Sequence, residues 1–233
     1  TPAYLQTHVL ADPRGKNLSM QIGVPQTDGT VVPYSYKGCK VVSAEFTCDL
    51  DQTLQASFDI DAQTVDRVPA LSAATYPATL APFHWGQATL KIGATVGTAI
   101  AIDGVRKVST KIDRPSNTER FYLGNSGLKR EPITNDLVAV SGSITADFLD
   151  KAVFAERFLD NTQFALVWSF KGAVISGVYF DTFEIELPAN FLTGPAPTLD
   201  GLDVVSGDFS FETFSNGTDP VATIRYITTD TTL

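Results

Sequence analysis

The sequence lacks most of the residues that catalysis or metal binding would require. It has two cysteines and two histidines among 233 residues, and His8 and His84 are far apart in the chain. Acid–base and nucleophilic sites need a histidine, a reactive cysteine or paired carboxylates in a recognisable local motif, and zinc sites need clustered cysteine and histidine. We therefore expect no enzymatic activity, no catalytic or metal-binding residues and no cofactor.

Disulfide bonds and membrane-spanning helices are also not expected. Cys39 and Cys48 are nine residues apart, and an odd separation along one strand places two side chains on opposite faces. We expect both to be free thiols. No apolar run approaches the roughly eighteen residues that a membrane-spanning helix needs, so no membrane partner is expected. The glycine-rich segment 124–127 lacks the spacing of a phosphate-binding loop and is interpreted as a turn.

Charge is sparse and mostly negative. Charged residues make up 18% of the chain, and the net charge is −9. Proteins that grip nucleic acid neutralise phosphates with clustered lysine and arginine, so this balance argues against nucleic-acid binding. Sparse charge leaves neutral polar surface that is suited to contact with protein.

The clearest structural signal is strict alternation of apolar and polar residues over 42–50 and again over 54–62. Alternation with period two is typical of half-buried strands, and the short polar break at 51–53 predicts a β-hairpin. In the register that this break suggests, Phe46 lies opposite Phe58 on the buried face.

The polar face of the same hairpin is acidic. The predicted register places Glu45 opposite Asp59, an arrangement of like charges that destabilises a strand pair. One interpretation is ordinary exposure to solvent; the other is a surface kept negative so that a polyanion does not adhere. The candidate acidic residues are Glu45, Asp49, Asp59 and Asp61.

Many further short strands follow, separated by Gly, Pro, Asn and Asp. This pattern is typical of an all-β sandwich or barrel. The region 188–207 is rich in Pro, Gly and Asp and predicts a long loop, where contacts between subunits are expected. The other predicted strands cover 88–92, 98–102, 105–112, 138–146, 164–170, 178–187, 209–214 and 222–228.

One helix interrupts the strands. It is predicted over about 150–160, with its first residue as the N-cap and Asn161 as the C-terminal stop. Phe154 and Phe158 are one turn apart, and Leu159 lies beside them. We expect this apolar stripe to pack on a sheet.

Basic residues gather in one segment of an otherwise acidic chain. One interpretation is a basic patch for docking between subunits; the other is an ordinary solvated strand and loop. Aromatic residues are too few there for a nucleic-acid platform. The candidate basic residues are Arg106, Lys107, Lys111, Arg114 and Arg120.

Several separated segments carry a resemblance to a known family, and its strength lies in their order along the chain. The sequence resembles the major tail tube proteins of long-tailed, non-contractile bacteriophages, particularly those that infect actinobacteria. The resemblance runs from about Asn17 onward. The segments are 32–41, 76–77, 82–90, 140–148 and 216–226.

The resemblance implies a mainly β tail-tube fold over residues 1–233, with two antiparallel sheets packed crosswise and one flanking helix. It implies hexameric rings that stack into a hollow tube, in which the inner sheets join into one barrel and close their edges. It also implies a negative lumen through which phage DNA passes without specific binding. The implied partners are further copies and the tail terminator, tape measure and distal tail proteins, in a virion tail assembled in the bacterial cytoplasm.

The N-terminal segment and the function each have alternative interpretations. Relatives extend further at the N-terminus, so residues 1–16 are expected to form an extended arm or the remainder of a truncated region. The alternative function is a β-sandwich binding module, such as a capsid decoration, baseplate or adhesin domain, which would expose an aromatic binding patch. A hydrolase on the same fold would need a carboxylate pair in a cleft.

Overall fold

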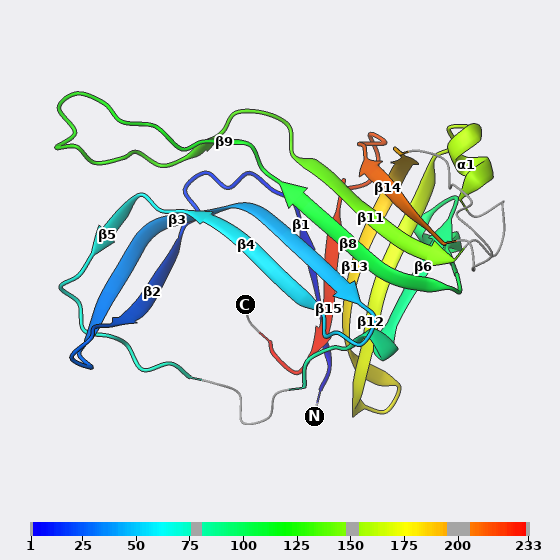
Figure 1. The fold of residues 1–233 in the computed structure, drawn as a ribbon, viewed down its shortest axis with the longest axis horizontal. Helices are drawn as coiled ribbons and strands as arrows, with labels where there is room; N and C mark the ends of the chain where they lie inside the picture. Colours follow the sequence, from blue (N-terminus) through cyan, green and yellow to red (C-terminus); the bar gives the residue numbers. More distant parts are fainter. Residues whose placement is uncertain (1, 76–80, 148–153, 195–205, 232–233) are drawn as a thin grey trace.

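Figure 1 shows a computed structural model in which two layers of strands cross each other and an arm projects from them. The structure describes residues 2–75, 81–147, 154–194 and 206–231. The strands are β1 Tyr4–Val9, β2 Leu18–Pro25, β3 Val31–Asp49, β4 Gln55–Asp61, β5 Thr64–Asp66, β6 Ala88–Gly93, β7 Ile100–Ala101, β8 Val105–Asp113, β9 Ser116–Asn117, β10 Ile133–Thr134, β11 Ala139–Asp147, β12 Phe164–Ser176, β13 Tyr179–Leu192, β14 Ser206–Thr213 and β15 Thr223–Thr228. The helices are α1 Ala155–Leu159 and two single turns, Trp85–Gln87 and Val96–Thr98.

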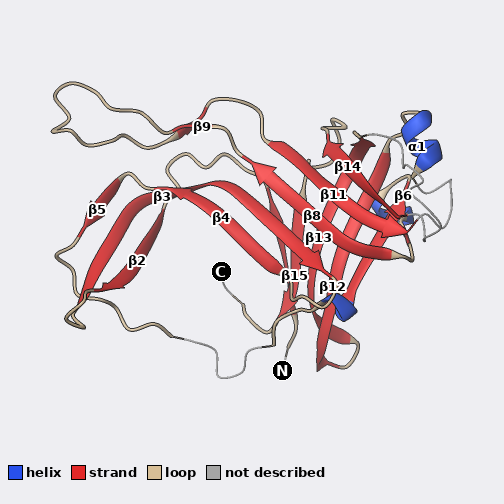
Figure 2. Cartoon of the chain, viewed as in Figure 1, coloured by secondary structure: helices blue, strands red, loops and turns tan. Residues whose placement is uncertain are grey.

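The strands form two layers that are joined at one point. Sheet I has the order β4-β3-β8-β11-β14, and sheet II has the order β1-β15-β13-β12-β6-β7. The pairs within both sheets are antiparallel, and residues 190–192 of β13 join the two layers by pairing with β14. Figure 2 shows the strands of sheet I running diagonally across those of sheet II. The predicted mainly β fold with two crosswise sheets and one helix is confirmed.

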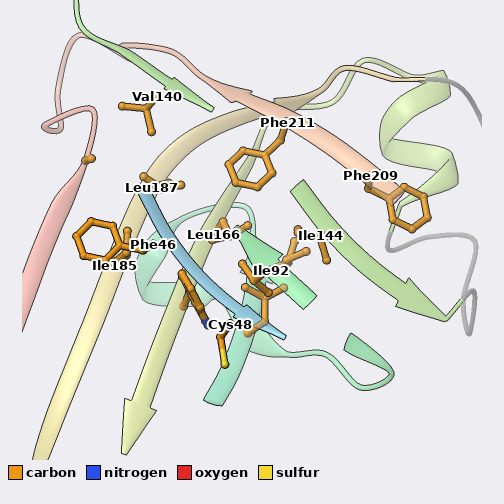
Figure 3. Packing of buried hydrophobic residues seen from close by; sticks show 14 of the residues in the cluster. Phe46, Cys48, Ile92, Val140, Ile144, Leu166, Ile185, Leu187, Phe209 and Phe211 are labelled. Atoms are coloured by element: carbon orange, nitrogen blue, oxygen red, sulfur yellow. The ribbon is translucent and has the colours of Figure 1, made fainter. Parts of the chain in front are cut away.

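The core lies between the two sheets and follows from alternation on both. Sheet I contributes Phe46, Ile144 and Phe211, and sheet II contributes Leu166 and Ile185 (Figure 3). Burying one such side chain contributes about 1.5–3 kcal/mol, so the two inner faces hold the sheets together. Both cysteines are buried and free, as predicted.

The register of the β3–β4 hairpin differs from the predicted one by two residues. Phe46 lies opposite Ala56, not Phe58. The turn begins at Asp49, whose carbonyl accepts a 3.2 Å hydrogen bond that closes it, and Asp51 adopts a positive φ of 59°. The turn starts one residue earlier than predicted, which shifts the pairing of the two strands by two residues. Because side chains alternate with a period of two residues, this shift leaves Phe46 and Phe58 on the predicted face.

The predicted loop at 188–207 is wrong at both of its ends. Residues 188–192 belong to β13 and residues 206–207 to β14, while 195–205 lie outside the described residues. Proline lacks an N–H group and is tolerated in a sheet only where the ladder is interrupted. Pro188 stands at such a point, because β13 pairs with β15 up to Glu186 and with β14 from Asn190 onward.

Helix α1 is shorter than predicted. It begins at Ala155, and the predicted N-cap at Asp150 lies outside the described residues. Asn161 follows the helix with φ 47°, as expected of a C-terminal stop. Phe154 is buried and stacks on Phe209 of β14 with ring centroids 4.1 Å apart. No helix in the described part of the chain is long and apolar enough to cross a membrane.

The packing prediction for the helix is wrong for Leu159. Phe158 is partly buried, but Leu159 is 75% exposed. The helix is only five residues long, and it is anchored by Phe154 at its start. Leu159, the last residue of the helix, therefore does not reach the part of the core around Phe209 that Phe154 contacts.

Strand β3 takes part in two separate pairings. Its first half pairs with β2 and β5, and its second half pairs with β4 and β8. Gly38, with φ 65°, marks the bend between the halves. We call β2, β5 and residues 31–38 of β3 the arm; it lies at the left of Figure 1 beside the long β8–β11 connection that carries β9 and β10.

Within the N-terminal segment 1–16, residues 4–9 form β1. This strand pairs with β15 over its whole length, from Tyr4 opposite Thr228 to Val9 opposite Thr223. Residues 4–9 are therefore an extended strand at the edge of sheet II.

Candidate functional site

The outer face of sheet I is polar on every strand. Cross-strand registers align its side chains in four rows, with hydroxyl and charged groups and no aromatic or large aliphatic residue among them. Carboxylates outnumber ammonium groups on this face. The rows are Asp59–Ser43–Asp113–Ala139, Ser57–Glu45–Lys111–Ser141–Glu212, Gln55–Thr47–Ser109–Ser143–Ser210 and Asp49–Lys107–Thr145–Asp208.

Hydrogen bonds between strands hold the short side chains of this outer face in place. The Ser43 hydroxyl donates to Asp59 at 2.5 Å, and the hydroxyls of Ser109 and Ser143 are 2.9 Å apart. Most side chains of this face are therefore short and polar, and few are long enough to grip a passing molecule.

Three of the four predicted acidic residues lie together on this face. Glu45 lies opposite Ser57 and Lys111, so the predicted clash between Glu45 and Asp59 does not occur. Asp61 is separate from them, because its carboxylate pairs with Lys129 of the β8–β11 connection, with 2.6 Å between Lys129 Nζ and Asp61 Oδ2.

The predicted basic residues do not form one patch. Lys107 and Lys111 lie on the acidic face, where they pair with Asp49 at 3.6 Å and Asp113 at 3.0 Å. The hydrogen bond and charge of Asp113, together with the charges of nearby carboxylates, raise the pKa of Lys111. Alternation along β8 makes these two lysines part of the acidic surface.

The arginines of the predicted patch lie elsewhere. Arg106 pairs with Asp147 at 2.8 Å, and Arg120 donates to the carbonyl oxygen of Glu131 at 2.5 Å. Arg114 follows the end of β8 and lines a groove between the sheets. Adjacent positions in the sequence are thus distributed over different surfaces.

Strand β4 is an open edge of sheet I. Within the part of the chain that the structure describes, β4 pairs only with β3. Residues 55–60 are exposed on both faces, and Phe58 is 51% exposed. An unpaired edge with apolar side chains is a template for pairing with another chain.

An open groove of about 430 Å³ lies between the sheets beside β4. Phe46 and Phe58 line it from sheet I, and Ile224 and Tyr226 line it from sheet II. Burial raises the pKa of the Tyr226 hydroxyl, which keeps that side chain neutral. The groove is therefore an apolar surface that continues the open edge inward.

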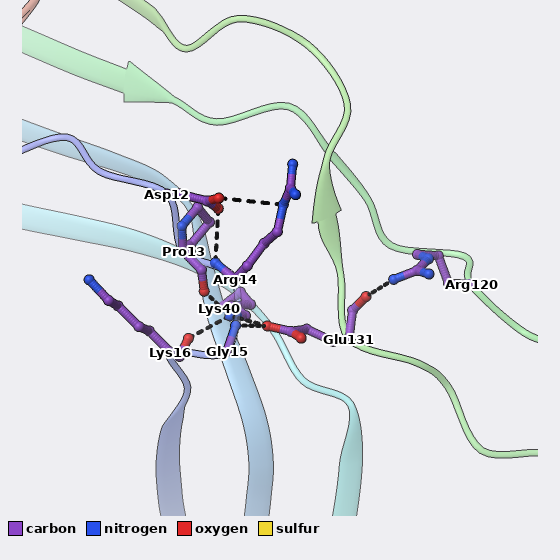
Figure 4. A network of polar contacts seen from close by, with 8 residues as sticks. All are labelled: Asp12, Pro13, Arg14, Gly15, Lys16, Lys40, Arg120 and Glu131. Atoms are coloured by element: carbon purple, nitrogen blue, oxygen red, sulfur yellow. Dashed lines mark hydrogen bonds and ion pairs between the residues drawn. The ribbon is translucent and has the colours of Figure 1, made fainter.

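A buried lysine fastens the base of the arm (Figure 4). Lys40 is 6% exposed, and its ammonium donates to the carbonyl oxygens of Pro13 and Lys16 and pairs with Glu131 at 2.6 Å. The hydrogen bond from Lys40, followed by one from the Gly15 N–H, lowers the pKa of Glu131. We call Lys40, Glu131 and these carbonyls the clasp; it joins three segments at the bend of β3.

The sequence reasoning missed the open edge, the groove and the clasp. One signal for the clasp was available, since Lys40 stands between Cys39 and Val41 in an otherwise apolar stretch. The edge had no such signal, because alternation does not show which strand lacks a partner. Among the described residues no three His, Cys, Asp or Glu side chains are grouped as metal ligands.

A crossed β-sandwich with a polar face and an open strand edge is suited to pairing with a further chain. The chain belongs to the phage tail tube protein family, whose model matches residues 8–213. No curated protein matches the chain. The resemblance to phage tail tube proteins is thus confirmed, and membership implies a non-enzymatic component of the virion tail that assembles with copies of itself and with other tail proteins.

Proposed function

We propose that this protein is the major tail tube subunit of a long-tailed, non-contractile phage, and that it forms stacked hexameric rings around a DNA-conducting lumen. The observation that carries the proposal is the outer face of sheet I, which is polar over five adjacent strands and carries six carboxylates against two ammonium groups. Membership of the phage tail tube protein family supports a role in the tail tube. The outer face of sheet I and the open β4 edge support the proposed arrangement of subunits around a lumen.

The outer face of sheet I is proposed to line the lumen. A wall that bound phosphate would retain the genome, because each phosphate contact releases counterions and strengthens adhesion. Lys107 and Lys111 are each paired with a carboxylate on this face, so neither presents an uncompensated charge. DNA passes such a wall without specific binding.

Ring closure is proposed to use the two ends of sheet I. β4 forms one edge of the sheet. On the other side β14 pairs with β13 only over residues 211–213, so residues 206–209 have no strand partner on that side among the described residues. When β4 of one copy pairs with this part of β14 in the next copy, the sheets form a closed barrel. The arm, with exposed Ile22, Val24 and Val31, extends beyond the sandwich and is suited to contact the next ring.

The proposed partners are therefore other copies, together with the tail terminator, tape measure and distal tail proteins, in a virion tail assembled in the bacterial cytoplasm. The test is negative-stain electron microscopy of the purified full chain over a range of concentrations. Six-fold rings or tubes are expected. Dispersed monomers or trimers at every concentration would contradict the proposal and favour a decoration, baseplate or adhesin module.

A second test addresses the lumen. Replacing Glu45 and Asp59 with lysine adds positive charge to the proposed wall without touching the core. We expect tubes that retain double-stranded DNA in a salt-dependent way, whereas wild-type tubes retain none. Equal retention by both proteins would show that this face does not line the lumen.

A further inference from the structure

We propose that helix α1 of one copy seats in the groove beneath β4 of the next copy, with Leu159 as the inserted side chain. The inference rests on the proposed ring and specifies the lateral contact within it. It assigns an occupant to the groove and a role to the exposed leucine.

The groove is open because β4 extends beyond the cover that sheet II provides. Phe58 and Ile60 point to the inner side of sheet I, as Phe46 does, yet both are exposed. Below them, Ile224 and Tyr226 of β15 form the floor. Exposure of such an apolar surface to water raises the free energy of the protein. An apolar side chain from a partner that covers the surface removes this unfavourable exposure.

The side chain proposed to fill the groove, Leu159, lies near the opposite edge of sheet I. Phe154, just before α1, stacks on Phe209 of β14, and Phe209 points to the inner side of sheet I. Helix α1 therefore lies on the inner side of sheet I at its β14 end, as Figure 1 shows. Leu159 at the end of the helix is 75% exposed.

Joining the two ends of sheet I brings the helix and the groove together. A β14 strand placed beside β4 carries its own α1 on the same inner side, which is the side on which the groove opens. The contact is heterologous, because each copy offers a helix at one end and a groove at the other. Such contacts generate rings when the rotation between copies closes.

Charge at the rim of the groove favours the same occupant. Lys16 and Arg114 line the groove beside its apolar residues, and Asp160 directly follows Leu159. Asp160 is exposed, so it can face the basic rim when Leu159 inserts. Complementary charge of this kind sets orientation more than affinity.

The experiment is cysteine cross-linking between two full-length variants, Leu159→Cys and Phe58→Cys. Mixed under assembling conditions and mildly oxidised, they are expected to give a covalent dimer, while each variant alone and the wild type give none. Cys39 and Cys48 are buried and provide the low background. The control pair is Leu137→Cys with Phe58→Cys, since Leu137 is 85% exposed and precedes β11 on another part of the surface.

Cross-linking at the control level, in samples that contain rings or tubes, would overturn the inference while leaving the proposed function intact. Absence of rings and tubes from wild-type protein would instead contradict the proposed function. A second variant, Leu159→Asp, is expected to raise the concentration needed for ring formation at least about tenfold. Assembly of that variant at the wild-type concentration, with an unchanged circular dichroism spectrum, would also overturn the inference.

Discussion

The sandwich and the arm are built from the same kind of strand but are stabilised in different ways. In the sandwich, Trp168 and Phe170 are completely enclosed between two sheets. In the arm, Ile22 and Val24 remain exposed, because β2, β5 and the first half of β3 have no second sheet over them. Apolar burial therefore stabilises the sandwich, whereas the position of the arm depends on polar contacts at its base. Alternation thus forms strands in both regions but forms a core only where two layers meet.

The largest effect is expected from removing the central side chain of the sandwich. Trp168 is 1% exposed and contacts Phe170, with ring centroids 5.2 Å apart. Trp168→Ala should lower the free energy of unfolding by about 3–5 kcal/mol, because it removes apolar burial and leaves a cavity. Urea denaturation of wild type and variant measures the change. The control is Val178→Ala at an exposed hairpin tip, and an equal loss in both variants would contradict the prediction.

A smaller loss is expected where two strands of sheet I approach closely. A Cβ atom at Gly142 would lie 2.2 Å from the Ser109 carbonyl oxygen and 2.4 Å from the Phe211 ring. Gly142→Ala should cost about 1–3 kcal/mol, since a backbone oxygen cannot move aside without disturbing β8. Thermal unfolding tests this, with Gly97→Ala, where no atom lies within 4 Å, as the matched control. A variant as stable as wild type would show that the strands can separate.

Loosening the clasp should affect the arm more than the sandwich. Lys40→Met keeps the volume of the side chain but removes the donor to two carbonyl oxygens and the ion-pair partner of Glu131, which still accepts from the Gly15 N–H; the cost is about 1–3 kcal/mol. We expect faster hydrogen exchange in residues 12–16 and in the β8–β11 connection, with unchanged exchange in β12 and β13. Lys37→Met, which removes an exposed ion pair with Asp66, is the control. Uniformly faster exchange throughout the chain would contradict a local role.

The smallest effect is expected from acid. The pKa of Glu131 is lowered in the folded chain, chiefly by Lys40, from an ordinary value of 4.5. A lowered pKa means that the clasp contributes fully above about pH 4.5 and loses its contribution as the pH falls through the folded value. The protection factors of amides in the clasp segments, which are exchange rates corrected for the intrinsic effect of pH, should therefore fall on acidification before those of the sandwich and should not change between pH 6 and pH 8. In Glu131→Gln the acid-dependent loss of protection should be smaller; an identical loss would assign it to other carboxylates.

Much of this protein could be predicted without a structure. Alternation assigned Phe46 to the core and Glu45 to the polar face, and the lack of clustered cysteine and histidine pointed away from catalysis. The two strand assignments succeeded because the side chains of one strand alternate between two faces whatever strand lies beside it.

The failures concern contacts between distant segments. The hairpin register depended on a turn that starts one residue early at Asp49, and the loop prediction at Pro188 ignored the change of partner along β13. The five basic residues were grouped by sequence, but their strands and loops placed them on different surfaces. Leu159 was predicted to pack on the sheet together with Phe154 and Phe158, but it is the last residue of a five-residue helix and is exposed.

Local features followed from the order of residues alone: which residues alternate, which side of each strand is apolar, that the cysteines stay free, and which family the order of segments resembles. Three features became evident only in the packed fold: β4 is an edge, the groove beside it is open, and Lys40 holds the base of the arm. A face follows from backbone geometry within one strand, whereas an edge, a groove and a buried ion pair depend on which distant segments lie next to one another.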